Sequence, residues 1–199
     1  ITWITFLIGN LALIGTPLFA GFYSKDAIIL AAHAASESGL YCAGLAYFAV
    51  LAGVFITAFY SFRVYFLVFH GKERYDQNPD AHHHDDHAHG HADKPHESPW
   101  VVTLPLLLLA IPSVIAGYVI MDLLFGGFFK DVIFVDGAKH GAMAALADDI
   151  HGVMAMTKHA LSSAPLYLAA GGVLCAYVFY ILKPEIPSKL KAFFQRIKV

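Results

Sequence analysis

The sequence predicts an all-α fold, a polytopic bundle of about four transmembrane helices in which the first helix is discontinuous. Hydrophobic residues make up 58% of the chain and charged residues 14%, whereas a soluble domain is nearer ~45–50% apolar and ~25% charged. Four apolar stretches approach the ~20 residues that a helix needs to cross a bilayer. A Gly-Thr-Pro sequence at residues 15–17 interrupts the first stretch. These observations indicate that lipid is the solvent of this chain.

The boundaries of the apolar runs predict each element in turn. The expected spans lie at residues 1–33, 41–69, 100–121 and 166–182. The second run is longer than a bilayer requires, so we expect it to tilt or to project into water. The chain divides accordingly into residues 1–69, a histidine-rich loop at 70–98, two further spans within 99–183 that are joined by a connection at 122–163, and an amphipathic segment at 184–199. Because the chain starts with Ile1 inside an apolar run, we expect it to be a segment of a longer protein.

The distribution of basic residues predicts the orientation. If successive spans alternate in direction, the side with the loop at 70–98 and the C-terminus carries nine Lys and Arg residues, and the opposite side carries three. The positive-inside rule then places the loop and the C-terminus in the cytoplasm and the connection at 122–163 in the periplasm. Lys25 is the basic residue left over. For residues 184–199, a helix on the membrane surface and a plain cytoplasmic tail both stay open.

The break in the first span is the strongest candidate functional feature. Pro17 lacks an N–H and its ring clashes with the carbonyl of Leu13, while Thr16 is pushed toward extended geometry. Backbone groups freed within a bilayer must be buried in protein or face a watery cavity, so Gly15, Thr16 and Pro17 predict a discontinuous helix of the kind that transporters use near ion sites.

Lys25 follows the break by eight residues and Asp26 is its neighbour. Burial disfavours the charged form of a lysine, so a buried Lys25 is able to take up and release a proton near neutral pH. Adjacent helical residues do not face each other, so Asp26 should point elsewhere, toward another basic group. The alternative is that residues 24–26 lie at the water interface and that Pro17 only kinks the helix.

The histidine tract within residues 82–96 is the second candidate. Imidazole and carboxylate groups suit zinc, copper or nickel, but a low-complexity tract has no fixed geometry. We therefore expect a flexible solvated loop and assign no metal site. No phosphate-binding loop, dinucleotide fingerprint or iron–sulfur cysteine pattern occurs, so no cofactor-binding residue is predicted. A net charge of −2 argues against nucleic acid as a partner.

Two motifs carry a family resemblance. GNLALIGTP at residues 9–17 with AGFYSKD at 20–26 resembles the broken twelfth transmembrane helix of the subunit L family of bacterial NADH:quinone oxidoreductases (respiratory complex I), whose mitochondrial relative is subunit 5. YSFR at 60–63 with VFHGKE at 68–73 is similar to the end of the next helix in that family. Beyond residue 74 the likeness is one of layout, and the histidine tract is not part of the family pattern.

The resemblance implies a role in moving protons within the membrane arm. Residues 1–69 would be the end of an antiporter-like proton-channel module, and residues 184–199 would lead toward a lateral helix. Lys25 matches the lysine that terminates the family's half-channel, and Asp26 matches the adjacent acid. The family's other channel groups lie on earlier helices. NADH, FMN, iron–sulfur clusters and quinone would be held by partner subunits, among them other subunits of the membrane arm.

Two further functions stay open at this stage. Subunits of multisubunit cation/proton antiporters and of membrane-bound hydrogenases share the first motif, without the same electron-transfer partner. A zinc transporter that uses the histidine loop is the candidate from another class, but it would need metal ligands within the spans. The expected location is the bacterial inner membrane in all of these cases.

Overall fold

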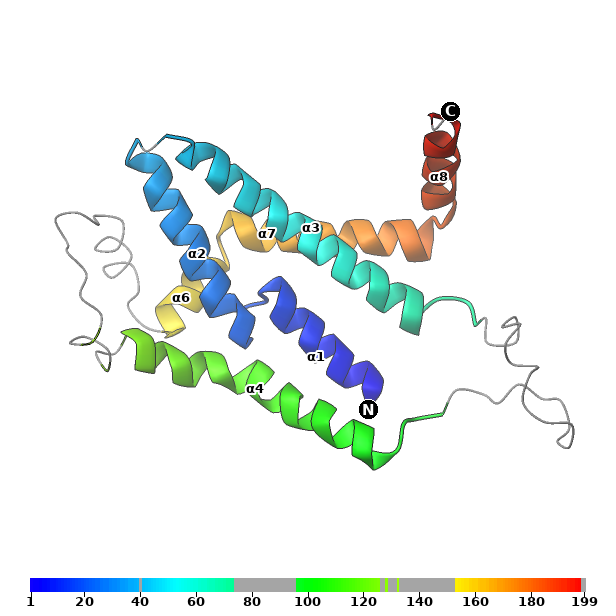
Figure 1. The fold of residues 1–199 in the computed structure, drawn as a ribbon, viewed down its shortest axis with the longest axis horizontal. Helices are drawn as coiled ribbons and strands as arrows, with labels where there is room; N and C mark the ends of the chain where they lie inside the picture. Colours follow the sequence, from blue (N-terminus) through cyan, green and yellow to red (C-terminus); the bar gives the residue numbers. More distant parts are fainter. Residues whose placement is uncertain (40, 74–95, 126–127, 129–131, 133–152, 198–199) are drawn as a thin grey trace, which may run out of the picture.

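The computed structural model describes residues 1–39, 41–73, 96–125, 128, 132 and 153–197. All regular secondary structure in these residues is helical (Figure 1). In chain order the elements are α1 (Thr2–Ile14), α2 (Ala20–Glu37), α3 (Ala43–Phe69), α4 (Trp100–Phe125), α6 (Val153–Ala160), α7 (Ala164–Tyr177), the π-helical η3 (Val178–Leu182) and α8 (Glu185–Ile197). The predicted all-α class is therefore confirmed for the described part of the chain.

Three of these helices are long and apolar enough to cross a membrane. They cover Ala43–Phe69, Trp100–Met121 and Ala164–Leu182, and the last combines α7 with η3. α1 is also apolar but has only 13 residues, which at ~1.5 Å per residue falls short of the ~30 Å hydrocarbon core. α1 and α2 must therefore share the first crossing, as expected for a discontinuous helix in a polytopic membrane protein.

The chain leaves the helical path where the sequence predicts a break. Gly15 adopts a left-handed conformation with φ 79°, and the N–H of Thr16 donates to the carbonyl of Leu11 at 3.0 Å. Leu18 also has a positive φ, of 78°, a strained conformation for a residue with a side chain. α2 then begins at Ala20 and ends at Glu37, four residues beyond the predicted boundary.

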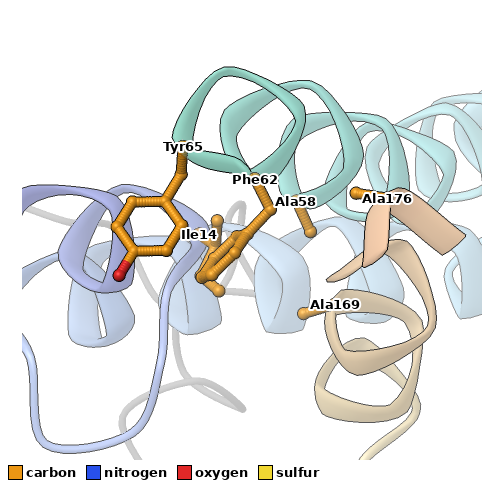
Figure 2. Packing of buried hydrophobic residues seen from close by; sticks show 6 residues of the cluster. All are labelled: Ile14, Ala58, Phe62, Tyr65, Ala169 and Ala176. Carbon is orange, nitrogen blue, oxygen red and sulfur yellow. The ribbon is translucent and has the colours of Figure 1, made fainter. Parts of the chain in front are cut away.

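The best-packed part of the described bundle lies between α3 and α7. Figure 2 shows its buried core, to which α1 also contributes through Ile14. The core residues are Ile14, Ala58, Phe62, Tyr65, Ala169 and Ala176. Gly172 lies directly on α3, because a Cβ at that position would stand 2.5 Å from the carbonyl oxygen of Phe55. Small residues that let two backbones approach are the usual means by which helices associate in lipid.

A second core packs α2 against α4 and α6. Phe22 and Tyr23 of α2 pack with Met121 of α4 and with Met156 and Ala160 of α6. α6 therefore folds back over α2, although it follows α4 in the chain (Figure 1). The two cores together fix both halves of the broken helix.

α8 stands off the bundle at the end of η3 (Figure 1). Its apolar side chains Leu190, Phe193 and Phe194 are all exposed, as in an amphipathic helix. Its placement on the membrane surface stays a prediction. The predicted histidine loop lies outside the described residues, apart from its two ends.

Candidate functional site

The candidate site lies where the end of α1 meets α2. Lys25 of α2 directs its Nζ back to the end of α1 and donates a hydrogen bond to the carbonyl oxygen of Leu13. In an uninterrupted helix that carbonyl would accept from the N–H of residue 17, which Pro17 lacks. The lysine therefore replaces the donor that the proline removes.

This contact is electrostatically favourable for a charged lysine. The last carbonyls of a helix have no intrahelical partner, and the helix dipole adds a partial negative charge at that end. The stem of Lys25 passes over Gly15, since a Cβ there would lie 3.2 Å from its Cδ. The absence of a side chain at Gly15 therefore permits the left-handed turn and also leaves room for the Lys25 side chain.

Asp26 follows Lys25 on α2 and, within the described part of the chain, makes no contact with the end of α1 of the kind that Lys25 makes. It is 5% exposed, and its Oδ2 atom is buried without a hydrogen-bond partner among the described residues. Asp26 is therefore buried within the described bundle, whereas Ser24, two residues earlier on α2, is exposed.

A small cavity joins the two side chains. Gly15, Pro17, Lys25, Asp26 and Ser163 line it together with apolar groups from α3 and α7. The volume of this cavity is about 20 Å³, which is enough for about one water molecule. Lys25 and Asp26 do not face each other, so a water molecule here would be the shortest link between them.

Of the five residues singled out in the sequence, Gly15, Pro17, Lys25 and Asp26 line the same cavity, and Thr16 lies in the turn between α1 and α2. The structure adds Ala160 and Ser163 to this lining. They were not predicted, because the connection at 122–163 carries no recognisable motif. The feature of the sequence that could have indicated α6 is the spacing of Met156 and Ala160, two apolar residues one helical turn apart within residues 153–160.

Among the residues that the structure describes, no group of three or more His, Cys, Asp or Glu side chains is arranged to hold a metal ion. The histidine tract falls outside those residues, so its metal binding stays untested.

The fold and the site define a class, a polytopic membrane protein with a lysine and an acid on a discontinuous helix. No family model matches the chain. The chain is 53% identical over 204 residues to subunit L of NADH-quinone oxidoreductase from Neisseria meningitidis, a match that covers 100% of this chain and 30% of that protein. The chain belongs to this family, as a segment that spans 30% of the length of these relatives.

More distant relatives carry corresponding names. Chain 5 of the NAD(P)H-quinone oxidoreductase of Picosynechococcus is 40% identical over 159 residues, covering 71% of this chain and 22% of the relative. Subunit L from Mycobacterium tuberculosis is 43% identical over 117 residues, covering 59% of this chain and 16% of the relative. The likeness to the subunit L and chain 5 group is therefore not confined to one genus.

Proposed function

We propose that this chain is part of a membrane subunit that translocates protons, driven by electron transfer from NADH to quinone in partner subunits. The relatives are named as subunits of quinone oxidoreductases. NADH, FMN, the iron–sulfur clusters and quinone would bind to those partners, which include the other subunits of the membrane arm. The role of this chain is then to carry protons across lipid, with Lys25 and Asp26 as the groups that hold them.

The contact between Lys25 and Leu13 carries the proposal. An ammonium group within a bilayer is costly unless it is paired or solvated. The end of α1 offers a carbonyl and a partial negative charge to the protonated lysine. When the lysine loses its proton, the attraction to the helix end weakens and the cavity beside it offers room for a water molecule. A site with this arrangement can both hold a proton and let it go.

The test is proton translocation by the reconstituted complex that contains the full-length subunit. Lys25→Ala removes the titrating group and should abolish most of the NADH-driven proton translocation through this subunit, because a positioned proton donor or acceptor usually contributes ~10²–10⁴-fold to the rate of its step. Lys25→Arg should fail as well, since a guanidinium keeps its proton at physiological pH. Lys25→Glu should keep part of the function if a titratable group is what matters.

Lys183→Ala is the matched control, because Lys183 follows η3 at the far end of the bundle and is exposed. Assembly and electron transfer to artificial acceptors should survive in all four variants. Wild-type pumping by Lys25→Ala would reduce Lys25 to a helix cap and overturn the proposal.

The orientation is part of the same proposal. We place residues 70–98 and the C-terminus in the cytoplasm and residues 122–163 in the periplasm of a bacterial inner membrane, on the basis of the basic residues. A cysteine introduced at Asn78 should be shielded from an impermeant reagent in intact cells, whereas one at Gly141 should be labelled. The reverse pattern would invert the topology and contradict the proposed orientation.

A further inference from the structure

Helix ends of opposite polarity face the cavity beside Lys25. Ile14 and Gly15, at the end of α1, line it together with Leu166, which lies in the first turn of α7. The end of a helix carries a partial negative charge and its start a partial positive charge, because the outermost carbonyl and N–H groups have no intrahelical partner. The cavity therefore lies in a local field that favours a cation next to α1 and an anion next to α7.

No side chain caps the start of α7 within the described structure. Ser163 occupies the N-cap position, yet its hydroxyl makes no hydrogen bond to the N–H groups of the first turn. It donates instead to the carbonyl oxygen of Ala160 at 2.8 Å. A hydroxyl oxygen that donates still has two lone pairs, so the Ser163 oxygen can accept a hydrogen bond from a group in the cavity that it lines.

Asp26 supplies the anion that this helix start favours. The residue is 5% exposed and lines the same cavity, and its Oδ2 atom is buried without a hydrogen-bond partner in the part of the chain that the structure describes. A carboxylate oxygen that is removed from water and left without a hydrogen bond is costly. The positive end of α7 offsets part of that cost, and a bound water molecule would supply the missing hydrogen bond.

The cavity has the size and the polar groups that one water molecule needs. Its volume is about 20 Å³, and a buried water requires ~10–15 Å³ and a few polar partners. The polar side chains of its lining are those of Lys25, Asp26 and Ser163. The space therefore admits one water molecule between a cation, an anion and a hydroxyl group, and it excludes a larger ligand.

We propose that Ser163 is a positioning residue, whose hydroxyl holds a water molecule between Lys25 and Asp26 and so lets a proton pass from one to the other. This inference rests on the proposed function and deepens it, because it names the group that connects the two proton carriers. It also gives a functional role to the start of α7, which the fold alone would assign to packing.

The transfer conserves atoms and charge. An N–H bond of the Lys25 ammonium breaks as an O–H bond forms on the water, and another O–H bond of that water breaks as one forms on the Asp26 carboxylate. The lysine becomes a neutral amine, the aspartate becomes a neutral acid, and the water is restored. Both helix ends then lose the charge that they stabilise, so the charged pair is the resting form of the site.

The experiment compares Ser163→Ala with Ser162→Ala in the assembled complex, reconstituted in vesicles. The hydroxyl of Ser162 makes the same kind of bond, to the carbonyl oxygen of His159 at 3.0 Å, but Ser162 is exposed and does not line the cavity. NADH-driven proton translocation should fall by about 2- to 10-fold in Ser163→Ala, as for the loss of one hydrogen bond. It should stay at the wild-type rate in Ser162→Ala.

An infrared band separates a positioning role from a structural one. The redox difference spectrum of the complex should contain the C=O band of protonated Asp26, identified by its loss in Asp26→Asn. Ser163→Ala should shift this band, because the acid loses its hydrogen-bonded water, whereas Ser162→Ala should leave it in place. Ser163→Cys keeps the shape of the side chain but hydrogen-bonds weakly, so it should assemble normally and slow pumping as the alanine does.

The outcomes separate this inference from the proposed function. Wild-type pumping by both Ser163 variants, or an Asp26 band that does not move, would overturn the inference. Equal losses in Ser162→Ala and Ser163→Ala would also overturn it, because the turn before α7 would then matter only for packing. If Lys25→Ala lowers pumping and the Ser163 variants do not, the proposed function stands and this inference alone fails. If Lys25→Ala pumps normally, the proposed function fails and the inference fails with it.

Discussion

The helix break and the crossing of α3 with α7 differ in how they are packed. At the break, a lysine reaches a carbonyl that has lost its helical donor, and Asp26 is buried beside a cavity. At the crossing, Ala58 and Ala176 are 0% exposed and Gly172 touches the backbone of α3. The first region keeps polar groups incompletely satisfied, whereas the second is packed backbone to backbone.

The difference shows where stability and function reside in this protein. Lipid tails are as apolar as leucine side chains, so helices in a membrane associate through close packing rather than through escape from water. The crossing supplies that packing. The break carries a strained Leu18 and a buried acid, which persist only when the surrounding structure holds them. Ile14, at the end of α1, belongs to the core of the crossing and ties the two regions together.

The largest effect is expected from overpacking the crossing. Gly172→Leu would drive a Cβ to 2.5 Å from the carbonyl oxygen of Phe55 and to 2.9 Å from the Cβ of Ala58, so the two helices must separate. We expect a loss of ~3 kcal/mol or more, seen as a lower thermal midpoint of the detergent-solubilised complex. Gly171→Ala is the control, because its Cβ would meet the ring of Phe55 at an ordinary 3.8 Å. Equal stability of the two variants would mean that α3 and α7 do not cross this closely.

A smaller change at the break should act on function more than on stability. Gly21→Ala would place a Cβ against the backbone carbonyl of Ala12, so α2 must move away from α1 and carry Lys25 from the carbonyl of Leu13. We expect a cost of ~1–3 kcal/mol in stability and a larger relative loss of proton translocation.

Gly9→Ala is the control for this change, since nothing lies within 4 Å of a Cβ at Gly9. Alanine is favoured over glycine within a helix by ~0.5–1 kcal/mol, so this variant should be as stable as the wild type or more so. Normal pumping by Gly21→Ala, measured in the same vesicles, would show that the contact between α1 and α2 does not position Lys25.

The π-helical end of α7 should contribute less. The guanidinium of Arg63 lies 5.5 Å from the centre of the Tyr180 ring, an attraction worth ~0.5–1 kcal/mol at an exposed site. Tyr180→Leu should lower the thermal midpoint slightly, whereas Tyr180→Phe keeps a ring face and should lower it less. If the leucine variant is as stable as the phenylalanine variant, the ring of Tyr180 matters only as apolar volume.

The smallest effect is expected from removing the histidine tract. Deleting residues 80–96 spares Glu97, whose carboxylate accepts the N–H of Thr2 at 3.0 Å and so ties the start of α1 to the segment before α4. NADH-driven proton translocation should stay near the wild-type rate, because a low-complexity tract has no fixed site geometry. A loss of pumping that added zinc restores would give the tract a metal-dependent role.

Local rules account for what could be predicted from the sequence. Hydropathy over ~20 residues identifies the spans because the thickness of a bilayer sets their length. Pro17 predicts the break because its missing N–H acts on a carbonyl four residues back. The count of basic residues on the two sides identified Lys25 as the one left over, and the motif at residues 9–26 identified the family.

The partners of these residues were decided only by the tertiary structure. The hydrogen bond from Lys25 joins groups 12 residues apart, and it forms because the turn at Gly15 brings α2 alongside the end of α1. α6 lies against α2, which is distant in the chain, because Met156 and Ala160 pack against Phe22 and Tyr23. Periodicity and composition describe one helix at a time, whereas these contacts depend on how closely several helices pack, and a single glycine such as Gly172 sets that distance.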